Sequence, residues 1–155
     1  MREILFRGKR KNGGFWLFGD LRQWSKTRKG IHDYSLMGTS EVEMETVGQF
    51  TGLTDKNGKR IFEGDIIRFL HYVGTVVFEE GCFGIAISCN DAFDWDYIDE
   101  EMKEYAGINQ ITACFNDHFI SLWEILWNFN CDQNICNVVE VIGNIHDNPE
   151  LLNAQ

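Results

Sequence analysis

The sequence predicts an all-β protein of mainly antiparallel strands, arranged as a small barrel or sandwich with short helical additions. Short apolar runs of strand length recur along the chain, they are rich in β-branched and aromatic residues, and glycine-centred turns separate them. The chain has 155 residues, of which 44% are hydrophobic and 25% charged. This size and composition predict one folded domain over 1–155 that needs neither a metal nor a disulfide to fold.

The strongest hairpin pattern stands near the start of the chain. An alternating run over 3–11 is followed by Asn12, Gly13 and Gly14, and then by the apolar run 15–18. Asparagine and glycine adopt positive φ at low cost, which favours a tight turn between two strands. We therefore predict a hairpin in this segment.

The same pattern predicts seven more strands. Between two of them, Asn57 and Gly58 form the tip of a turn, and Gly64 interrupts the chain again before the next apolar run. The expected strands lie near 31–37 and at 47–53, 60–62, 66–70, 75–79, 82–87 and 138–142.

Helical spacing is predicted in three places. An acidic insertion of about 90–105 carries apolar residues at steps of three and four, although the sequence leaves open whether 91–104 is helix or loop. Residues 122–129 form a short helix that is apolar nearly all round, as is typical of a buried element or an oligomer contact. A short helix over 149–152 follows Asn148 as its N-cap. The recurring apolar residues of the insertion are Trp95, Ile98, Met102 and Tyr105.

Charge is unevenly distributed along the chain. The net charge is −10, yet residues 1–30 hold nine basic and two acidic side chains, whereas the remaining 125 residues hold five basic and 22 acidic ones. Three interpretations of this basic N-terminal hairpin, about 1–30, stay open. It lies against acidic surface of its own chain, binds an acidic partner or a phosphate backbone, or docks onto a second copy. The first is the commonest situation for surface charge.

The sequence predicts no catalytic, metal or cofactor site. Asp117 and His118 are the nearest approach to an acid–base pair, but adjacent residues on a strand point to opposite faces. Asp94, Asp96 and Asp99 lack the central glycine of a calcium-binding loop. The five cysteines form no CxxC pair, and the sequence has no phosphate loop, dinucleotide fingerprint or HExxH motif. We therefore expect no enzymatic activity, no metal and no cofactor.

Nothing in the sequence predicts export or membrane insertion. Charged residues interrupt every apolar run near the N-terminus, so no signal peptide is expected. The most apolar later stretch, 119–129, is too short to cross a bilayer. An odd number of cysteines without a secretion sequence predicts reduced thiols. These features predict a cytoplasmic protein without a membrane partner.

Two blocks of the sequence resemble the signature of the YopX family. The first, at 45–67, is ETVGQFTGLTDKNGKRIFEGDII, and the second, at 139–152, is VEVIGNIHDNPELL. The opening at 2–8 is also similar to that family, whereas Met44 and His146 stand where its pattern has proline and tyrosine. The resemblance implies a phage or prophage gene in a bacterial host, a mostly β fold and no assigned activity.

The first block contains mainly residues that form turns. Gly52, Gly58 and Gly64 stand where tight turns are expected. Asp65 follows the last of them and is expected to accept hydrogen bonds from turn amides. These residues explain a fold and demand no ligand.

Two binding functions fit these features, and the first is a non-enzymatic accessory protein. It would bind a host or phage protein and assemble with copies of itself as a homo-oligomer, for example as a ring. Its support lies in 91–104 and 121–130, which match no family pattern and carry aromatics; the alternative is that these aromatics are core. The later stretch supplies Trp123, Trp127 and Phe129. The residues predicted to bind the partner, with their aromatics exposed, are Phe93, Trp95, Asp96, Tyr97 and Asp99.

The second function is a small barrel that binds nucleic acid through the basic hairpin. The rhythm of Gly-Asp-Ile-Ile and Gly-Thr-Val-Val resembles small barrels that bind RNA or DNA, which is an analogy of fold. The net charge of the whole chain opposes this function unless the basic residues form a separate face, so it is the less favoured one. Its predicted residues are Arg7, Lys9, Arg10, Lys11, Lys26, Arg28 and Lys29.

Overall fold

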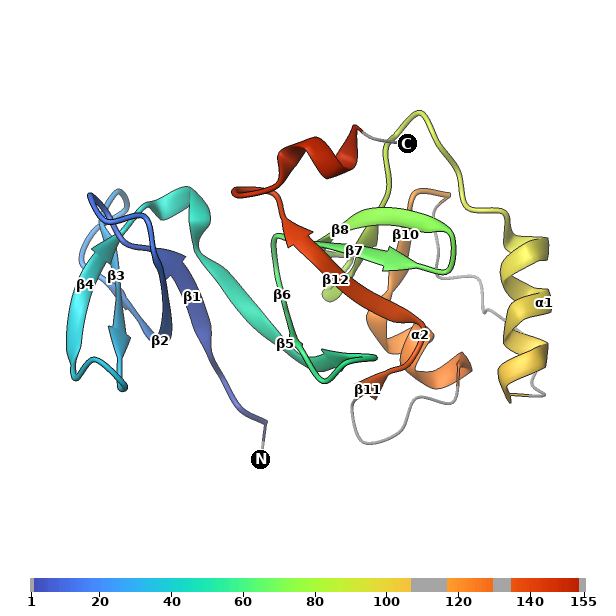
Figure 1. Ribbon diagram of the computed structural model, residues 1–155, viewed down its shortest axis with the longest axis horizontal. Helices are drawn as coiled ribbons and strands as arrows, with labels where there is room; N and C mark the ends of the chain where they lie inside the picture. Colours follow the sequence, from blue (N-terminus) through green and yellow to red (C-terminus); the bar gives the residue numbers. More distant parts are fainter. Residues whose placement is uncertain (1, 107–116, 130–134, 154–155) are drawn as a thin grey trace. The chain divides into compact units, whose positions relative to one another are not determined.

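The computed structural model describes residues 2–106, 117–129 and 135–153 (Figure 1). The chain forms two compact units, Met1–Gly52 and Leu53–Gln155, named unit 1 and unit 2 below. Strand β5, Gly48–Asp55, begins in unit 1 and ends in unit 2. The expectation that 1–155 is a single domain stays a prediction.

Unit 1 is an antiparallel sheet in the order β5-β1-β2-β3-β4. The predicted N-terminal hairpin is confirmed, since β1 pairs with β2 and Asn12 in the turn has a φ of 63°. The single strand expected near 31–37 is two strands, because the Asp33 carboxylate accepts from the backbone N–H groups of Ser35 and Leu36 and so stabilises a turn. The bounds are β1 Phe6–Lys9, β2 Trp16–Gln23, β3 Lys29–Asp33, β4 Gly38–Val42 and a 3-10 helix, η1, Met44–Thr46.

The sheet of unit 1 curls until β1 and β4 meet at one end. The backbone N–H of Glu43 donates to Lys9 O at 2.8 Å, and that of Lys11 donates to Glu41 O at 3.0 Å. Strand β2 turns the corner, since its pairing changes from β1 to β3 just after Gly19. The predicted barrel-like, mainly antiparallel class is confirmed, although neither sheet of the described residues forms a closed barrel.

The core of unit 1 is small. Its buried apolar residues are Leu17, Ile31 and Val42, each at most 1% exposed. Because Leu17 on β2 points into this core, its neighbours Trp16 and Phe18 point to the opposite side of the sheet. This opposite side is named the outer face of unit 1 below.

Unit 2 is built on a five-stranded antiparallel sheet in the order β10-β9-β8-β7-β12. Strands β6 and β11 pair with β5, and β11 does so in parallel. The strands predicted here are confirmed, with bounds that differ by at most three residues. The predicted strands are β6 Arg60–Phe62, β7 Asp65–Phe69, β8 Tyr72–Glu79, β9 Cys82–Ala86 and β12 Val139–Asn144. The sequence did not predict the two short strands β10 Phe119–Ser121 and β11 Ile135–Cys136.

The helices of unit 2 follow the predicted positions. The acidic insertion is helical over α1, Trp95–Ala106, which answers the question that the sequence leaves open. Helix α2, Leu122–Asn128, starts at Ser121, whose hydroxyl accepts from the backbone N–H of Trp123 at 3.1 Å. The predicted C-terminal helix is confirmed as the 3-10 helix η2, Pro149–Leu152.

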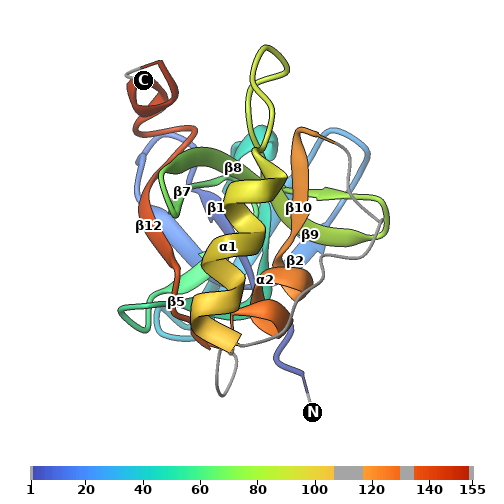
Figure 2. The same ribbon diagram turned by 90° about the vertical axis from the view of Figure 1, so that its right-hand side faces the viewer.

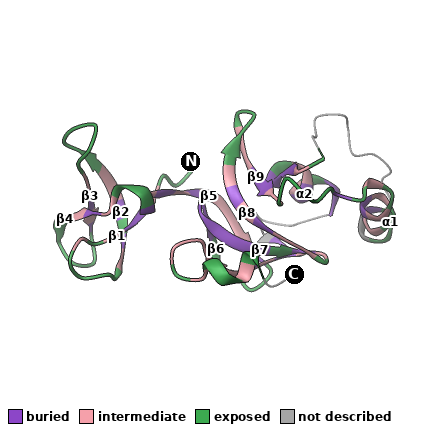
Figure 3. Cartoon of the chain, turned by 90° about the horizontal axis from the view of Figure 1, so that it is seen from above, coloured by how far each residue is buried: buried purple, intermediate pink, exposed green. Residues whose placement is uncertain are grey.

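The core of unit 2 joins its sheet to one side of each helix (Figure 3). Helix α1 contributes Ile98 and Met102, α2 contributes Leu122 and Ile125, and β7 contributes Phe69; each is at most 1% exposed. Both helices are therefore held in place by buried apolar contacts. The side chain of the fourth predicted helix-face residue lies outside the described residues; it is Tyr105.

The block at 45–67 forms the turns that its composition predicts. Gly58 and Gly64 have φ values of 80° and 90° and stand in turns, whereas Gly52, with a φ of 87°, lies within β5. Asp65 is 2% exposed and accepts from the backbone N–H of Phe62 at 2.7 Å, as predicted. The block thus shapes the chain between β5 and β7.

Candidate binding surfaces

Helices α1 and α2 lie next to each other in unit 2 (Figure 2). The start of α1 is attached to the residues before β10, since the Trp95 indole N–H donates to Asp117 Oδ1 at 3.3 Å. His118 contacts the backbone oxygen of Asp91 through Nδ1. Asp117 and His118 thus have different partners, and both hold the segment that leads into α1.

The expectation that Phe93 is exposed is wrong. Its side chain is 4% exposed, and its ring centroid lies 4.8 Å from that of Tyr72 and 6.4 Å from that of Phe69. Phe129 is also buried, at 1% exposed, with its ring edge-on to Phe69 at 5.6 Å. The core interpretation therefore holds for these two phenylalanines, because they complete the aromatic cluster between the sheet and the helices.

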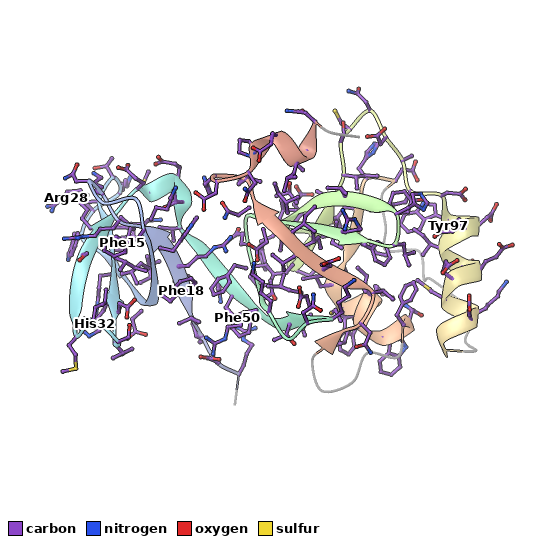
Figure 4. All side chains as sticks on the ribbon, viewed as in Figure 1. Phe15, Phe18, Arg28, His32, Phe50 and Tyr97 are labelled. Atoms are coloured by element: carbon purple, nitrogen blue, oxygen red, sulfur yellow. The ribbon has the colours of Figure 1, made fainter. Side chains whose placement is uncertain are left out.

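The other predicted partner-binding residues lie along α1. Trp95 and Tyr97 are half-buried, Asp96 is exposed and Asp99 is half-buried. Tyr97 stands at the start of the helix (Figure 4), with its ring 4.7 Å from that of His71. Their role in binding a partner stays a prediction.

Among the described residues of unit 2, two tryptophans on α2 are the largest exposed apolar side chains. Trp123 is 59% exposed and Trp127 63%, and their ring centroids are 5.7 Å apart. A spacing of four residues places both on one face of the helix, opposite the buried Leu122 and Ile125. The sequence grouped these two with Phe129, and the fold separates them from it. They are named the tryptophan pair below.

In unit 1, the predicted basic residues of β1 lie against an aromatic ring. The guanidinium carbon of Arg7 is 4.7 Å from the Trp16 ring centroid, and Lys9 Nζ is 5.8 Å from it. Arg7 is only 7% exposed, and its predicted role in binding nucleic acid stays a prediction. The Trp16 ring, which lies on the same side of the sheet as Arg7, covers the Arg7 guanidinium.

Two further cation–aromatic pairs are exposed in the turns of unit 1. Arg10 lies over Phe15 at 5.3 Å, and Arg28 lies over Trp24 at 5.2 Å. The two rings are 46% and 49% exposed. Sequence reasoning named the cations and missed their rings, although each ring stands within five residues of its cation in the sequence.

Glu41 joins two of the predicted cations. Its Oε1 accepts from Lys11 Nζ at 3.2 Å and from Arg28 Nε at 3.1 Å. The hydrogen bond from Arg28 and, to a smaller extent, that from Lys11 lower the pKa of Glu41. This contact agrees with the interpretation that the basic segment lies partly against acidic surface of its own chain. Lys26 is exposed and Lys29 half-buried.

The described residues contain neither a metal-binding cluster nor a membrane-crossing helix. In the described ranges, no three His, Cys, Asp or Glu side chains gather as a metal site. No helix there is long and apolar enough to cross a bilayer. Cys82 and Cys89 are free thiols, whereas Cys114 and Cys131 lie outside the described residues.

Comparison with known proteins identifies the family. A family model described as YopX protein matches residues 5–118, well over half of the chain. The matched range contains the block at 45–67, whereas the block at 139–152 lies beyond it. A search of the curated proteins finds no match. Because this match covers well over half of the chain, the chain belongs to the YopX protein family.

Proposed function

We propose that this protein is a phage-type accessory protein without enzymatic activity that acts in the cytoplasm of a bacterial host. It binds a basic protein of the host or the phage through the tryptophan pair of α2 and the acidic helix α1. The observation that carries this proposal is the tryptophan pair itself, 59% and 63% exposed beside a stretch, 91–104, with seven acidic residues and one basic residue.

The physics of the pair favours a protein partner. Tryptophan is enriched among the residues that contribute most to protein–protein affinity, because its large surface loses water on binding at little cost in side-chain entropy. The pair cannot turn inward, because Leu122 and Ile125 on the other side of α2 already fill the core. The neighbouring acids attract a basic partner and raise its association rate.

Affinity capture from bacterial lysate, with nuclease present, tests this proposal. The wild-type chain is expected to retain a protein that the double variant Trp123→Ala/Trp127→Ala loses, with at least about tenfold less recovered, because hot-spot residues contribute about 2 kcal/mol or more. A matched control is Phe78→Ala, which removes a 54%-exposed aromatic from β8 of the same unit.

The two variants separate the tryptophan pair from exposed aromatics in general. Equal recovery by the wild type and the double variant would contradict the proposal. Loss in both variants would show that the captured protein recognises any exposed apolar surface.

Self-assembly is the second part of the proposal. Unit 1 has nine basic and six acidic side chains, and unit 2 has five basic and 18 acidic ones, so a head-to-tail contact between copies would pair opposite charges. Light scattering after size exclusion is expected to give a multiple of 18.0 kDa at low salt. The mass should fall in about 1 M NaCl, where the screening length is about 3 Å. A chain of 18.0 kDa under both conditions contradicts this assembly.

A further inference from the structure

The outer face of unit 1 interleaves aromatic rings and cations. On β1 and β2 the pairing places Arg7 opposite Phe18 and Lys9 opposite Trp16, and residues opposite each other point to the same side of a sheet. Past the corner of the sheet, this face carries a further cation, Arg22 of β2, which stands opposite Gly30 of β3.

The exposed indole of Trp24 lies at the edge of this face. A Cβ atom on Gly30 would lie 2.6 Å from Trp24 Cη2, so only glycine leaves room for the indole to lie over the strand. Arg28 lies over the same indole, and its Nε is held by Glu41 at 3.1 Å. A guanidinium fixed in this way loses less side-chain entropy when it meets a phosphate than a freely moving one.

The second exposed pair belongs to the same end of unit 1. Lys11, in the turn that carries Arg10 and Phe15, shares Glu41 with Arg28. Figure 4 shows Phe15 and Arg28 at this end, with His32 at the other end of β3. Two rings, three cations and one carboxylate are therefore gathered in one patch; Arg10, Lys11, Phe15, Trp24, Arg28 and Glu41 are named the aromatic–basic patch below.

The charge of unit 1 differs in sign from that of the rest of the chain. Nine basic and six acidic side chains give unit 1 a net charge of +3, whereas unit 2 has a net charge of −13. The objection that an acidic protein repels nucleic acid therefore does not apply to this unit taken by itself. A ligand that combines anionic groups with flat rings would match both components of the patch.

We infer that the aromatic–basic patch of unit 1 binds single-stranded nucleic acid. Unpaired bases stack against the exposed parts of the Trp24 and Phe15 rings, and the phosphates between them pair with Arg10 and Arg28. A duplex fits less well, because its bases are already stacked on each other and would leave the exposed rings without a partner. This inference rests on unit 1 alone and does not depend on the partner proposed for α1 and α2.

Fluorescence anisotropy of labelled oligonucleotides with the full chain tests the inference. Oligothymidylate and oligouridylate of about 20 nucleotides are compared with a duplex of equal length in about 50 mM salt. We expect the single strands to bind more tightly than the duplex. Trp24→Ala should weaken their binding by about tenfold, whereas Trp24→Phe, which keeps a ring, should remain within about threefold of the wild type.

The salt dependence tests the phosphate contacts separately. The slope of log Kobs against log salt is expected to become shallower by about 0.7 in Arg28→Gln, as one phosphate contact is lost. Phe78→Ala is the matched control, since it removes an exposed aromatic side chain from unit 2 and should leave binding unchanged.

Three results would overturn the inference. They are the absence of single-strand binding in about 50 mM salt, equal binding of the duplex with no effect of Trp24→Ala, and equally tight binding of polyglutamate. The third result would reassign the patch to an acidic protein. Failure of nucleic-acid binding leaves the capture result for the tryptophan pair untouched, because that experiment is carried out with nuclease and concerns unit 2.

Discussion

Replacement of Asp55 by alanine is expected to lower the free energy of unfolding by about 3 to 5 kcal/mol. The side chain is 0% exposed and accepts three backbone hydrogen bonds. Its Oδ1 accepts from the N–H groups of Asn57 and Lys59, both at 2.9 Å, and its Oδ2 accepts from that of Val141 on β12, also at 2.9 Å. In the variant the two turn amides reach water, but the amide of the buried Val141 is left without an acceptor.

Urea denaturation followed by circular dichroism measures this loss. Asp91→Ala is a suitable control, because Asp91 is exposed and its removal should change the free energy of unfolding by no more than about 0.5 kcal/mol. A loss below about 1 kcal/mol in Asp55→Ala would show that the three bonds are not maintained in solution.

The second large effect is expected for Gly19→Ala, which should destabilise unit 1 by about 3 kcal/mol or more. A Cβ atom at this position would lie 1.8 Å from the backbone oxygen of His32 and 3.2 Å from the Cα of Asp33. Both atoms belong to the backbone of β3, so no side-chain rotation relieves the clash. Strand β2 exchanges partners at this point, and the small core of unit 1 has little stability in reserve.

Hydrogen exchange of the backbone amides in β1 to β4 measures this loss of stability. Protection there should fall about a hundredfold or more in Gly19→Ala, since about 3 kcal/mol corresponds to that factor in the opening equilibrium. Gly38→Ala provides the contrast, because the nearest atom to a Cβ there is Leu36 O at 3.9 Å. Equal protection in the two variants would mean that β2 and β3 approach each other less closely at Gly19 than the structure shows.

The two surfaces proposed for binding differ in kind and in location. Unit 1 presents cations held against rings, as between Arg28 and Trp24, and unit 2 presents Trp123 and Trp127 beside an acidic helix. The net charge of −10 averages over these opposite surfaces and conceals both. The distribution of charge along the sequence therefore describes these two surfaces better than its sum does.

Sequence reasoning found the candidate site in part. It named Arg10, Lys11 and Arg28 from charge alone, and the structure gathers them around Glu41 with two exposed rings. It also named Trp123 within an apolar cluster. It could not separate exposed aromatics from buried ones, because the composition of a short segment does not say which neighbour covers it.

The sequence by itself determined the positions of turns and of a helix start. The hairpin at Asn12, the turns at Gly58 and Gly64, and the start of α2 at Ser121 depend on the φ preference or the hydrogen bonds of a few consecutive residues. The family resemblance likewise came from the sequence, since the block at 45–67 is one continuous run of residues.

Only the tertiary structure decided which residues are covered and which are paired. Phe93 is buried although it stands in an acidic stretch of the sequence, and Trp127 is exposed although it stands in an apolar one. The hydrogen bond from Val141 to Asp55 joins residues 86 positions apart, and the backbone of His32 lies so close to Gly19 only because β2 and β3 pair there. Such contacts depend on how distant segments pack, and the free energy of that packing is a property of the whole fold and not of any short stretch of sequence.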